Sequence, residues 1–134
     1  MKIEIKIKHL EFIQSVINRL ANNSFLIKGW SITVFLAGLG FFLSQKQLSA
    51  LPIVIFVIII FWFLDAFYLK QERLFRKLYS DITKNRLIMP FDMDISKYNA
   101  KTPSTLKIML GYPLYLLYLP MIAIDLSIYL ICLN

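Results

Sequence analysis

The stretch FWFLDAFYLKQERLFRKLY, residues 61–79, changes character along its length and decides how the whole chain is interpreted. It begins with aromatic and aliphatic residues typical of a membrane span and ends with basic residues at helical spacing. One carboxylate, Asp65, lies inside the apolar half. Because a charge in that position is costly in a bilayer, Asp65 needs either a partner or a function.

The composition of the whole chain also indicates a membrane protein. Of 134 residues, 58% are hydrophobic, and the mean hydropathy is +0.64. Soluble domains contain about 45–50% apolar residues, and here these residues are gathered in long blocks. We predict an all-α integral membrane protein with a single membrane domain over residues 1–134: an antiparallel two-span hairpin extended by cytoplasmic helices, plus a kinked third transmembrane segment.

The N-terminal part changes its periodicity twice. Residues 1–8 alternate isoleucine with charged residues, which is the period of a β-strand. Residues 9–23 carry apolar residues three and four apart, which predicts a cytoplasmic amphipathic helix. Asn22, Asn23 and Ser24 are poor residues for a helix interior and good caps, so we expect this helix to end there and Ser24 to cap the next one.

Residues 25–44 are long enough to cross a bilayer and contain one charge, Lys28, one turn from their start. A lysine there can extend to the lipid headgroups, where Trp30 is also favoured. Small residues recur along this span and predict a face that another helix can approach closely, although chance spacing is the alternative. We call them the small-residue stripe: Thr33, Ala37, Gly40 and Ser44.

Two further apolar blocks follow. Residues 48–69 come after a short polar turn and predict the second span of the hairpin, with Pro52 in a first turn that tolerates proline. Residues 70–84 continue the helix into water, and residues 85–105 read as a cytoplasmic loop.

The last block, residues 106–133, is longer than one straight span requires. Thr102 and Pro103 predict its start, as the N-cap and the first helical residue. Gly111, Pro113 and Pro120 interrupt it, which favours a tilted or kinked third span over a re-entrant or interfacial segment.

The basic residues divide unevenly between the two sides of the predicted hairpin. Of 15 Lys and Arg, only Lys46 lies in the turn between the first two spans, and the other fourteen lie on the side of the N-terminus and the long loop. The positive-inside bias makes that side cytoplasmic. We therefore expect a multi-pass protein of the bacterial inner membrane with its C-terminus outside.

In an antiparallel hairpin the start of the first span and the end of the second lie at one depth. Lys28 and Asp65 thus become neighbours, and pairing lowers the cost of both charges. The same register brings Arg19 near Glu72, and polar side chains recur three or four apart on the second helix. We call the predicted set the polar seam: Arg19, Lys28, Asp65, Tyr68, Glu72 and Arg76. The alternatives are an unpartnered Asp65 that reaches the headgroups, or a charge in an ion or proton path.

Other chemistry is weakly signalled. The sequence has no glycine-rich phosphate loop, no H-E-x-x-H and no nucleophile elbow, so we expect no enzyme activity, cofactor or metal. Asp92 and Asp94 suit a solvated loop better than a metal site. His9 is expected at the surface with its ring nitrogens satisfied, and Cys132 is expected to be a buried inert thiol.

Basic residues of the second cytoplasmic helix form a set that we call the basic face: Arg73, Lys77, Lys84 and Arg86. Topogenic charge with contact to anionic lipid is the favoured interpretation. A cytoplasmic protein partner is the next, and nucleic acid is disfavoured.

Two blocks resemble a group of small, largely uncharacterised bacterial multi-span inner-membrane proteins. The first, N-R-x3-N-S-F-x2-K-G-W, matches residues 18–30, and the second, F-W-x-L-D-x2-Y-L-x2-E-R-L-F-R, matches residues 61–76. The resemblance covers roughly residues 9–90. It implies the hairpin architecture but no activity, because the group supplies none to carry over.

Three functions stay open at this stage. The first is an oligomeric membrane-perturbing or pore-forming effector, by analogy with membrane effectors of antiphage defence, controlled through its cytoplasmic helices. The second is a non-conducting scaffold or regulatory subunit that docks a cytoplasmic protein. The third is a small transporter or channel with Asp65 or Asp125 in its path, Asp125 being expected near the outer boundary, either solvated or lining an oligomer interior. The expected partners are the lipid bilayer, other copies of the chain and a cytoplasmic protein.

Overall fold

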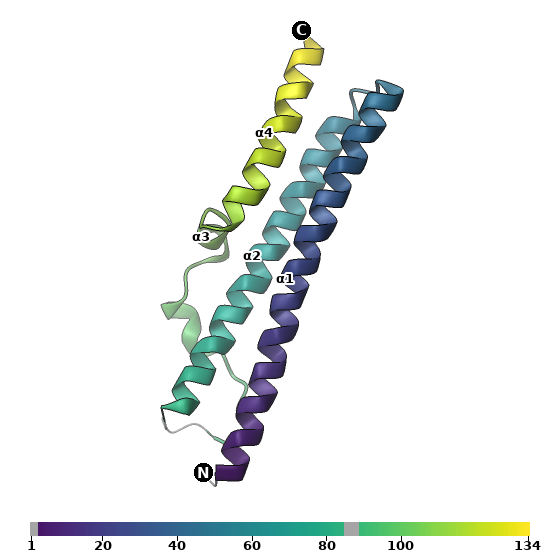
Figure 1. The fold of residues 1–134 in the computed structure, drawn as a ribbon. Helices are drawn as coiled ribbons and strands as arrows, with labels where there is room; N and C mark the ends of the chain where they lie inside the picture. Colours follow the sequence, from purple (N-terminus) through teal and green to yellow (C-terminus); the bar gives the residue numbers. More distant parts are fainter. Residues whose placement is uncertain (1–2, 85–88) are drawn as a thin grey trace.

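Two long helices dominate the molecule. The computed structural model describes residues 3–84 and 89–134, and every regular element within them is helical (Figure 1). Helix α1 covers Ile3–Gln45 and helix α2 covers Ala50–Thr83. They run antiparallel, side by side, and join through a short turn at the end opposite to the N-terminus (Figure 1).

Three shorter helices follow α2. The 3-10 helix η1 covers Ser96–Lys101, helix α3 covers Thr105–Met109, and helix α4 covers Leu114–Leu133. Helices α3 and α4 pack against α2, and α4 ends at the same end of the molecule as the hairpin turn (Figure 1). The prediction of an all-α chain is confirmed for the described residues.

Among the described residues, three helices are long and apolar enough to cross a membrane: α1, α2 and α4. The first two extend well beyond their apolar parts. We call residues 3–23 of α1 and residues 70–83 of α2 the polar end of the hairpin, because these parts carry most of its charges.

Helix α1 contradicts two local expectations. It is one continuous helix of 43 residues, so the described part of residues 1–8 is not strand-like and no helix ends at residues 22–24. Tertiary packing explains both differences, since α1 lies against α2 along its length and this contact outweighs weak local propensity. Ile13 and Ile17 are buried there, and Ser24 faces α2 instead of capping a helix.

Glycine permits the closest approach of the two long helices. A Cβ added to Gly38 would lie 2.1 Å from Cγ2 of Val54 on α2, which no packed structure tolerates. Gly40, two residues along, faces open space. The hairpin therefore closes on the face that contains Gly38, and the opposite face of α1 points away from α2.

Two apolar clusters hold the helices together. One lies in the apolar part of the molecule and joins α1, α2, α3 and α4: Phe35, Val54, Ile58, Ala66, Ile108, Leu114, Tyr118 and Met121. The other lies at the polar end and joins α1, α2 and η1: Ile13, Ile17, Leu74, Leu78, Ile82 and Tyr98. In the cluster at the polar end, each buried aliphatic side chain contributes about 1.5–3 kcal/mol relative to exposure in water.

The segment after the loop also differs from its prediction. Ser104, not Thr102, caps α3, and its hydroxyl accepts a hydrogen bond from the Lys107 amide at 3.3 Å. Thr102 is buried instead, and its hydroxyl donates to the Tyr98 carbonyl at 3.0 Å. The apolar block is divided between α3 and α4 by a turn that contains Gly111.

Candidate functional site

The side chain of Asp65 is completely buried and gathers polar partners from two other helices. The Lys28 ammonium on α1 lies 2.7 Å from Oδ2 and donates to Oδ1 at 2.8 Å. The Ser24 hydroxyl, also on α1, donates to the same Oδ1. From α4, the Tyr118 hydroxyl donates to Oδ2 at 3.0 Å. We call these four residues the Asp65 cluster.

Helical spacing explains why Ser24, Lys28 and Tyr118 each face Asp65. Ser24 and Lys28 are four residues apart and therefore share one face of α1, where Lys28 Nζ also donates to the Ser24 hydroxyl at 2.7 Å. Tyr118 lies one turn after the start of α4, on its buried face. One carboxylate thus joins the three helices that are long enough to cross a membrane.

Electrostatics favour this arrangement over isolated charges. An unpaired carboxylate in an apolar interior loses several kcal/mol of solvation, and a nearby cation with hydrogen bonds offsets that loss. Asp65 receives both, and its two oxygens share four short polar contacts. Lys28 keeps 29% of its side chain exposed, which fits a long side chain that lies along apolar surface with its head near water.

Aromatic residues fix the third helix beside the cluster. Trp62 lies on α2 one turn before Asp65, and its Nε1 donates to the Met109 carbonyl of α3 at 3.0 Å. Its ring stacks on that of Tyr118 with centroids 5.9 Å apart. The Tyr118 hydroxyl is thus aimed at Asp65 by a packed ring as well as by its own hydrogen bond.

The rest of the predicted polar seam does not join this site. Arg19 is exposed, and among the described residues no hydrogen bond or ion pair links it to Glu72. Glu72 pairs along its own helix with Arg76, Nε to Oε1 at 2.7 Å. Tyr68 makes an edge contact with the ring of its neighbour Phe67. Seam positions beyond Asp65 lie where water competes, so local pairs replace pairs across the helices.

The small-residue stripe is exposed along its whole length: Thr33, Ala37, Gly40 and Ser44. The close contact between α1 and α2 is made at Gly38 and not by the stripe, although Ala37 borders it and lines a groove with Val54 of α2. The Thr33 hydroxyl is satisfied inside the helix, since it donates to the Gly29 carbonyl at 3.0 Å. The stripe therefore leaves a smooth, uncharged surface on the outside of α1.

The basic face is only partly a free charged surface. Lys77 donates to the carbonyl of Lys101 and, at 2.8 Å, to the Thr102 hydroxyl, so it anchors the end of η1 to α2. Lys84 is exposed, Arg73 is half-buried, and Arg86 lies outside the described residues. Lys77 thus makes a structural contact within the chain, and its contact with anionic lipid or a partner stays a prediction.

Two single residues also correct their predictions. His9 is buried, not at the surface; its Nε2 lies 3.1 Å from the Asp92 carbonyl, and its Nδ1 has no partner among the described residues. Cys132 is exposed, not buried. The first reflects the loop after α2, which returns to α1 and places Phe91 against the His9 ring at 5.7 Å.

Asp92 and Asp94 form turns of the loop, since each accepts a backbone hydrogen bond from a residue two positions on, at 2.9 Å. Hydrogen bonding by Ser96 lowers the pKa of Asp94 below its ordinary range, and the nearby Lys97 acts in the same direction. Over the described residues, no three His, Cys, Asp or Glu lie close enough together to hold a metal ion.

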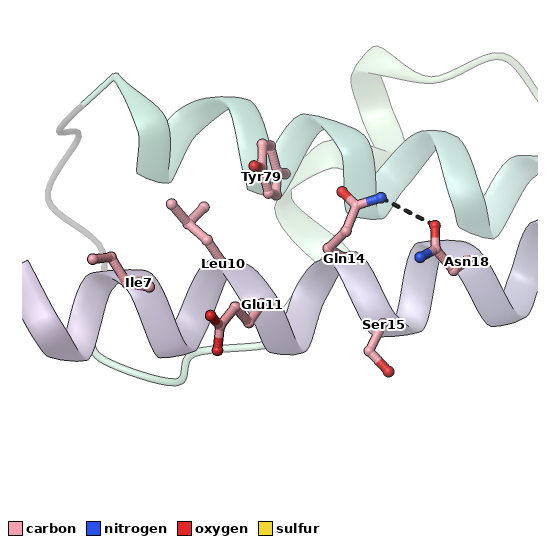
Figure 2. A pocket seen from close by; sticks show the side chains of 7 residues that line it. All are labelled: Ile7, Leu10, Glu11, Gln14, Ser15, Asn18 and Tyr79. Carbon is pink, nitrogen blue, oxygen red and sulfur yellow. Dashed lines mark hydrogen bonds between the residues drawn. The ribbon is translucent and has the colours of Figure 1, made fainter.

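A groove of about 580 Å³ lies at the polar end between α1 and α2 (Figure 2). Tyr79 reaches into it from α2, and all its other lining residues come from α1: Ile7, Leu10, Glu11, Gln14, Ser15 and Asn18. Gln14 and Asn18 hydrogen-bond to each other at 3.0 Å along one side (Figure 2). The groove combines an apolar floor with amides and one carboxylate, a mixture suited to a protein segment.

Sequence reasoning missed two members of the Asp65 cluster, Ser24 and Tyr118. Ser24 carried a usable signal, because it lies four residues before Lys28 and so on the same helix face. The sequence signal for Tyr118 was weaker. The position of the third helix along α2 decides which of its aromatic residues contacts Asp65, and the sequence does not reveal that position. A comparison of the chain with protein families, with characterised proteins and with solved structures finds no match.

Proposed function

We propose that the chain is a multi-pass protein of the bacterial inner membrane that acts as an oligomeric membrane-perturbing or pore-forming effector. In this proposal the Asp65 cluster is a latch, and the polar end of the hairpin controls it. One observation carries the proposal: a single buried carboxylate binds side chains of both other long helices. Loss of that one group removes the polar contacts between α4 and the hairpin, and in this proposal the weakened contact lets α4 move as in a two-state switch.

Charge and shape support the proposed placement in the membrane. Fourteen of 15 basic residues lie on the side of the N-terminus and the loop after α2, so that side faces the cytoplasm. The hairpin turn and the end of α4 lie together at the other end of the molecule (Figure 1). This arrangement supports a cytoplasmic polar end, three crossing helices and an outer C-terminus, with the turn at Gly111 directly before the third crossing helix, α4.

The latch lies where the polar end can act on it. Ser24 and Lys28 directly follow the α1 part of the polar end, and Asp65 precedes the α2 part by about one turn. Both long helices are continuous through this border, so a shift of one against the other at the groove moves Lys28 relative to Asp65. A cytoplasmic protein segment in the groove is the proposed trigger.

Several copies are required for a pore. The centre of the three-helix unit is filled by side chains such as Ile58 and Tyr118, which are fully buried, so one chain encloses no channel. The exposed small-residue stripe gives the outer face of α1 the smooth surface on which helices of neighbouring copies pack closely.

The groove supports a second candidate function, a non-conducting scaffold or regulatory subunit. Its size and mixed lining suit a docked segment of a cytoplasmic protein even if no current flows. Affinity capture from membranes then recovers one stoichiometric partner, and Tyr79→Ala abolishes that recovery.

Membrane potential in cells, read with a voltage-sensitive dye during controlled induction, tests the proposal. We expect the wild type to depolarise the membrane and Asp65→Asn to do so at a lower level of expression, because the latch is weakened. Asp94→Asn is the matched control, since Asp94 is exposed in the loop, and it should behave as wild type. Full membrane potential with protein inserted at wild-type levels contradicts the effector and favours the scaffold.

A further inference from the structure

A second aspartate, Asp125, is fully buried without any partner. Its side chain has no exposed surface, and neither carboxylate oxygen has a hydrogen bond or ion pair among the described residues. It lies near the middle of α4, which at 1.5 Å per residue is about 30 Å long. The expectation that Asp125 lies near the outer boundary assumed a third span that starts at residue 106, whereas helix α4 begins at Leu114.

The helices of the same chain enclose Asp125. The buried residues of α4 are four, three and four apart: Leu114, Tyr118, Met121 and Asp125. This spacing places them on one face, which is the face that packs against α2. A basic side chain from a second protein cannot reach a carboxylate in that position, so only a small species can satisfy it.

The donor set favours a proton over a divalent cation. A calcium ion requires six to eight oxygen ligands and a magnesium ion requires six, of which one carboxylate supplies at most two. Within residues 3–84 and 89–134, no group of three His, Cys, Asp or Glu stands ready to complete such a set. A proton requires one oxygen only, and it removes the charge whose burial is costly.

We propose that Asp125 is a proton-binding site inside the membrane that exchanges its proton with the Asp65 cluster. This inference rests on the membrane placement in the proposed function, and it names the proton as the species that the protein handles. The titratable or charged groups that meet the packed face of α4 belong to the Asp65 cluster: Tyr118 on α4 itself, Asp65 on α2 and Lys28 on α1. Ser31 on α1 adds a buried hydroxyl, which donates to the Lys28 carbonyl at 2.8 Å.

The transfer is a relay with one gap. Tyr118 and Asp125 are seven residues apart, about 10 Å along the helix. Because packed side chains fill this part of the core, the proposed transfer requires a local opening of the helices that admits water between the two groups. The O–H bond of the Asp125 carboxyl breaks as water takes the proton, and water gives one proton to the Tyr118 hydroxyl oxygen. That hydroxyl passes its own proton to Asp65. Asp125 loses one proton, Asp65 gains one, and Tyr118 and water are unchanged.

Infrared difference spectroscopy reads the bound proton directly. The full chain is placed in vesicles of phosphatidylethanolamine and phosphatidylglycerol, and spectra in acidic and alkaline buffer are compared. We expect a carboxyl C=O band that shifts in heavy water and is lost in Asp125→Asn. Asp125→Glu should restore it at a displaced frequency. Asp94→Asn is the control that leaves it unchanged.

The same band tests the route. After transfer to heavy water, Tyr118→Phe should slow the shift, whereas Tyr115→Phe, at an exposed position of the same helix, should not. A band that persists in Asp125→Asn overturns the site, and so does the absence of any carboxyl band in a wild type whose circular dichroism is helical. Equal exchange rates in Tyr118→Phe and wild type overturn the route.

This experiment is independent of the test of the proposed function. The infrared band requires no current, so a chain that leaves the membrane potential intact can still show it. A chain that depolarises cells but lacks the band keeps the effector function and loses the proton site.

Discussion

Two aspartates on neighbouring helices are equally buried and have opposite surroundings. Asp65 and Asp125 each have no exposed side-chain surface. Lys28, Ser24 and Tyr118 all bind Asp65, whereas Asp125 has no partner among the described residues. Tyr118, which binds Asp65, and Asp125 lie on the same packed face of α4. The two aspartates therefore differ in the side chains that face them and not in their burial.

The comparison separates a carboxylate that stabilises the fold, Asp65, from one that is free to bind a proton, Asp125. A buried carboxylate with a cation and two hydroxyl donors stabilises the contact of three helices once it has formed. A buried carboxylate without partners costs free energy, which selection tolerates where the group is used. The region around Asp65 is therefore interpreted as a latch and the region around Asp125 as a proton site.

The largest expected effect comes from removing the cation beside Asp65. Lys28→Met leaves that carboxylate buried with no countercharge, and we expect the free energy of unfolding to fall by about 3 kcal/mol. The measurement is denaturant titration in detergent micelles, followed by circular dichroism.

The double variant Lys28→Met with Asp65→Leu is the matched control for this pair. Because it removes both charges, it should recover most of the loss, with a coupling of about 1–3 kcal/mol. Additive losses would show that the two side chains do not act as a pair, and the latch would have to be abandoned.

The next effect has the opposite sign. Asp125→Val replaces an unsatisfied carboxylate by an apolar side chain of similar volume, so we expect stability to rise by about 1–2 kcal/mol in the same titration. Asp65→Val should instead destabilise the protein by about 3 kcal/mol, because Lys28 is left without its partner. A loss of stability in Asp125→Val would mean that Asp125 has a stabilising partner, and the contrast between the two aspartates would disappear.

A smaller effect is expected at the third helix. Tyr118→Phe removes the hydroxyl that donates to Asp65 but keeps the ring on Trp62, so we expect a loss of about 1.5 kcal/mol. Tyr115→Phe, at an exposed position, should change stability by less than the error of the titration. Equal values for the two variants would place α4 outside the latch.

Much of the fold could be predicted because long apolar blocks leave few alternatives. The three helices long enough to cross a membrane follow from block length alone. Local signals failed where tertiary contact overrides them, as at residues 22–24, which lie inside α1 because α2 packs beside it. The prediction that Thr102 caps the next helix failed for the same reason. Thr102 is in contact with Lys77, and Ser104 caps α3 instead.

The part of the candidate site that depends only on the geometry of the α1–α2 hairpin could be predicted. Equal depth in an antiparallel pair brings Lys28 and Asp65 together, and the structure places them in contact. The same register does not carry over to Arg19 and Glu72, because Arg19 is exposed and Glu72 pairs instead with Arg76, one turn along its own helix. Tyr118 and the isolation of Asp125 depend on where the third helix begins, which no periodicity in an almost wholly apolar block reveals.

The smallest expected effect concerns a third aspartate, Asp94, which is exposed and hydrogen-bonded. Hydrogen bonds from Ser96 hold its pKa below the ordinary value of 3.8. A lowered pKa in the folded state contributes stability above the ordinary value, and that stability is lost as the pH falls through the folded value. Carboxyl-carbon NMR titration should give a midpoint below 3.8 for Asp94, and Ser96→Ala should move it upward, whereas Ser104→Ala should not. An unmoved midpoint in Ser96→Ala would show that the loop turn does not bind this carboxylate. Asp94 would then no longer serve as an exposed, hydrogen-bonded carboxylate for comparison with Asp65 and Asp125.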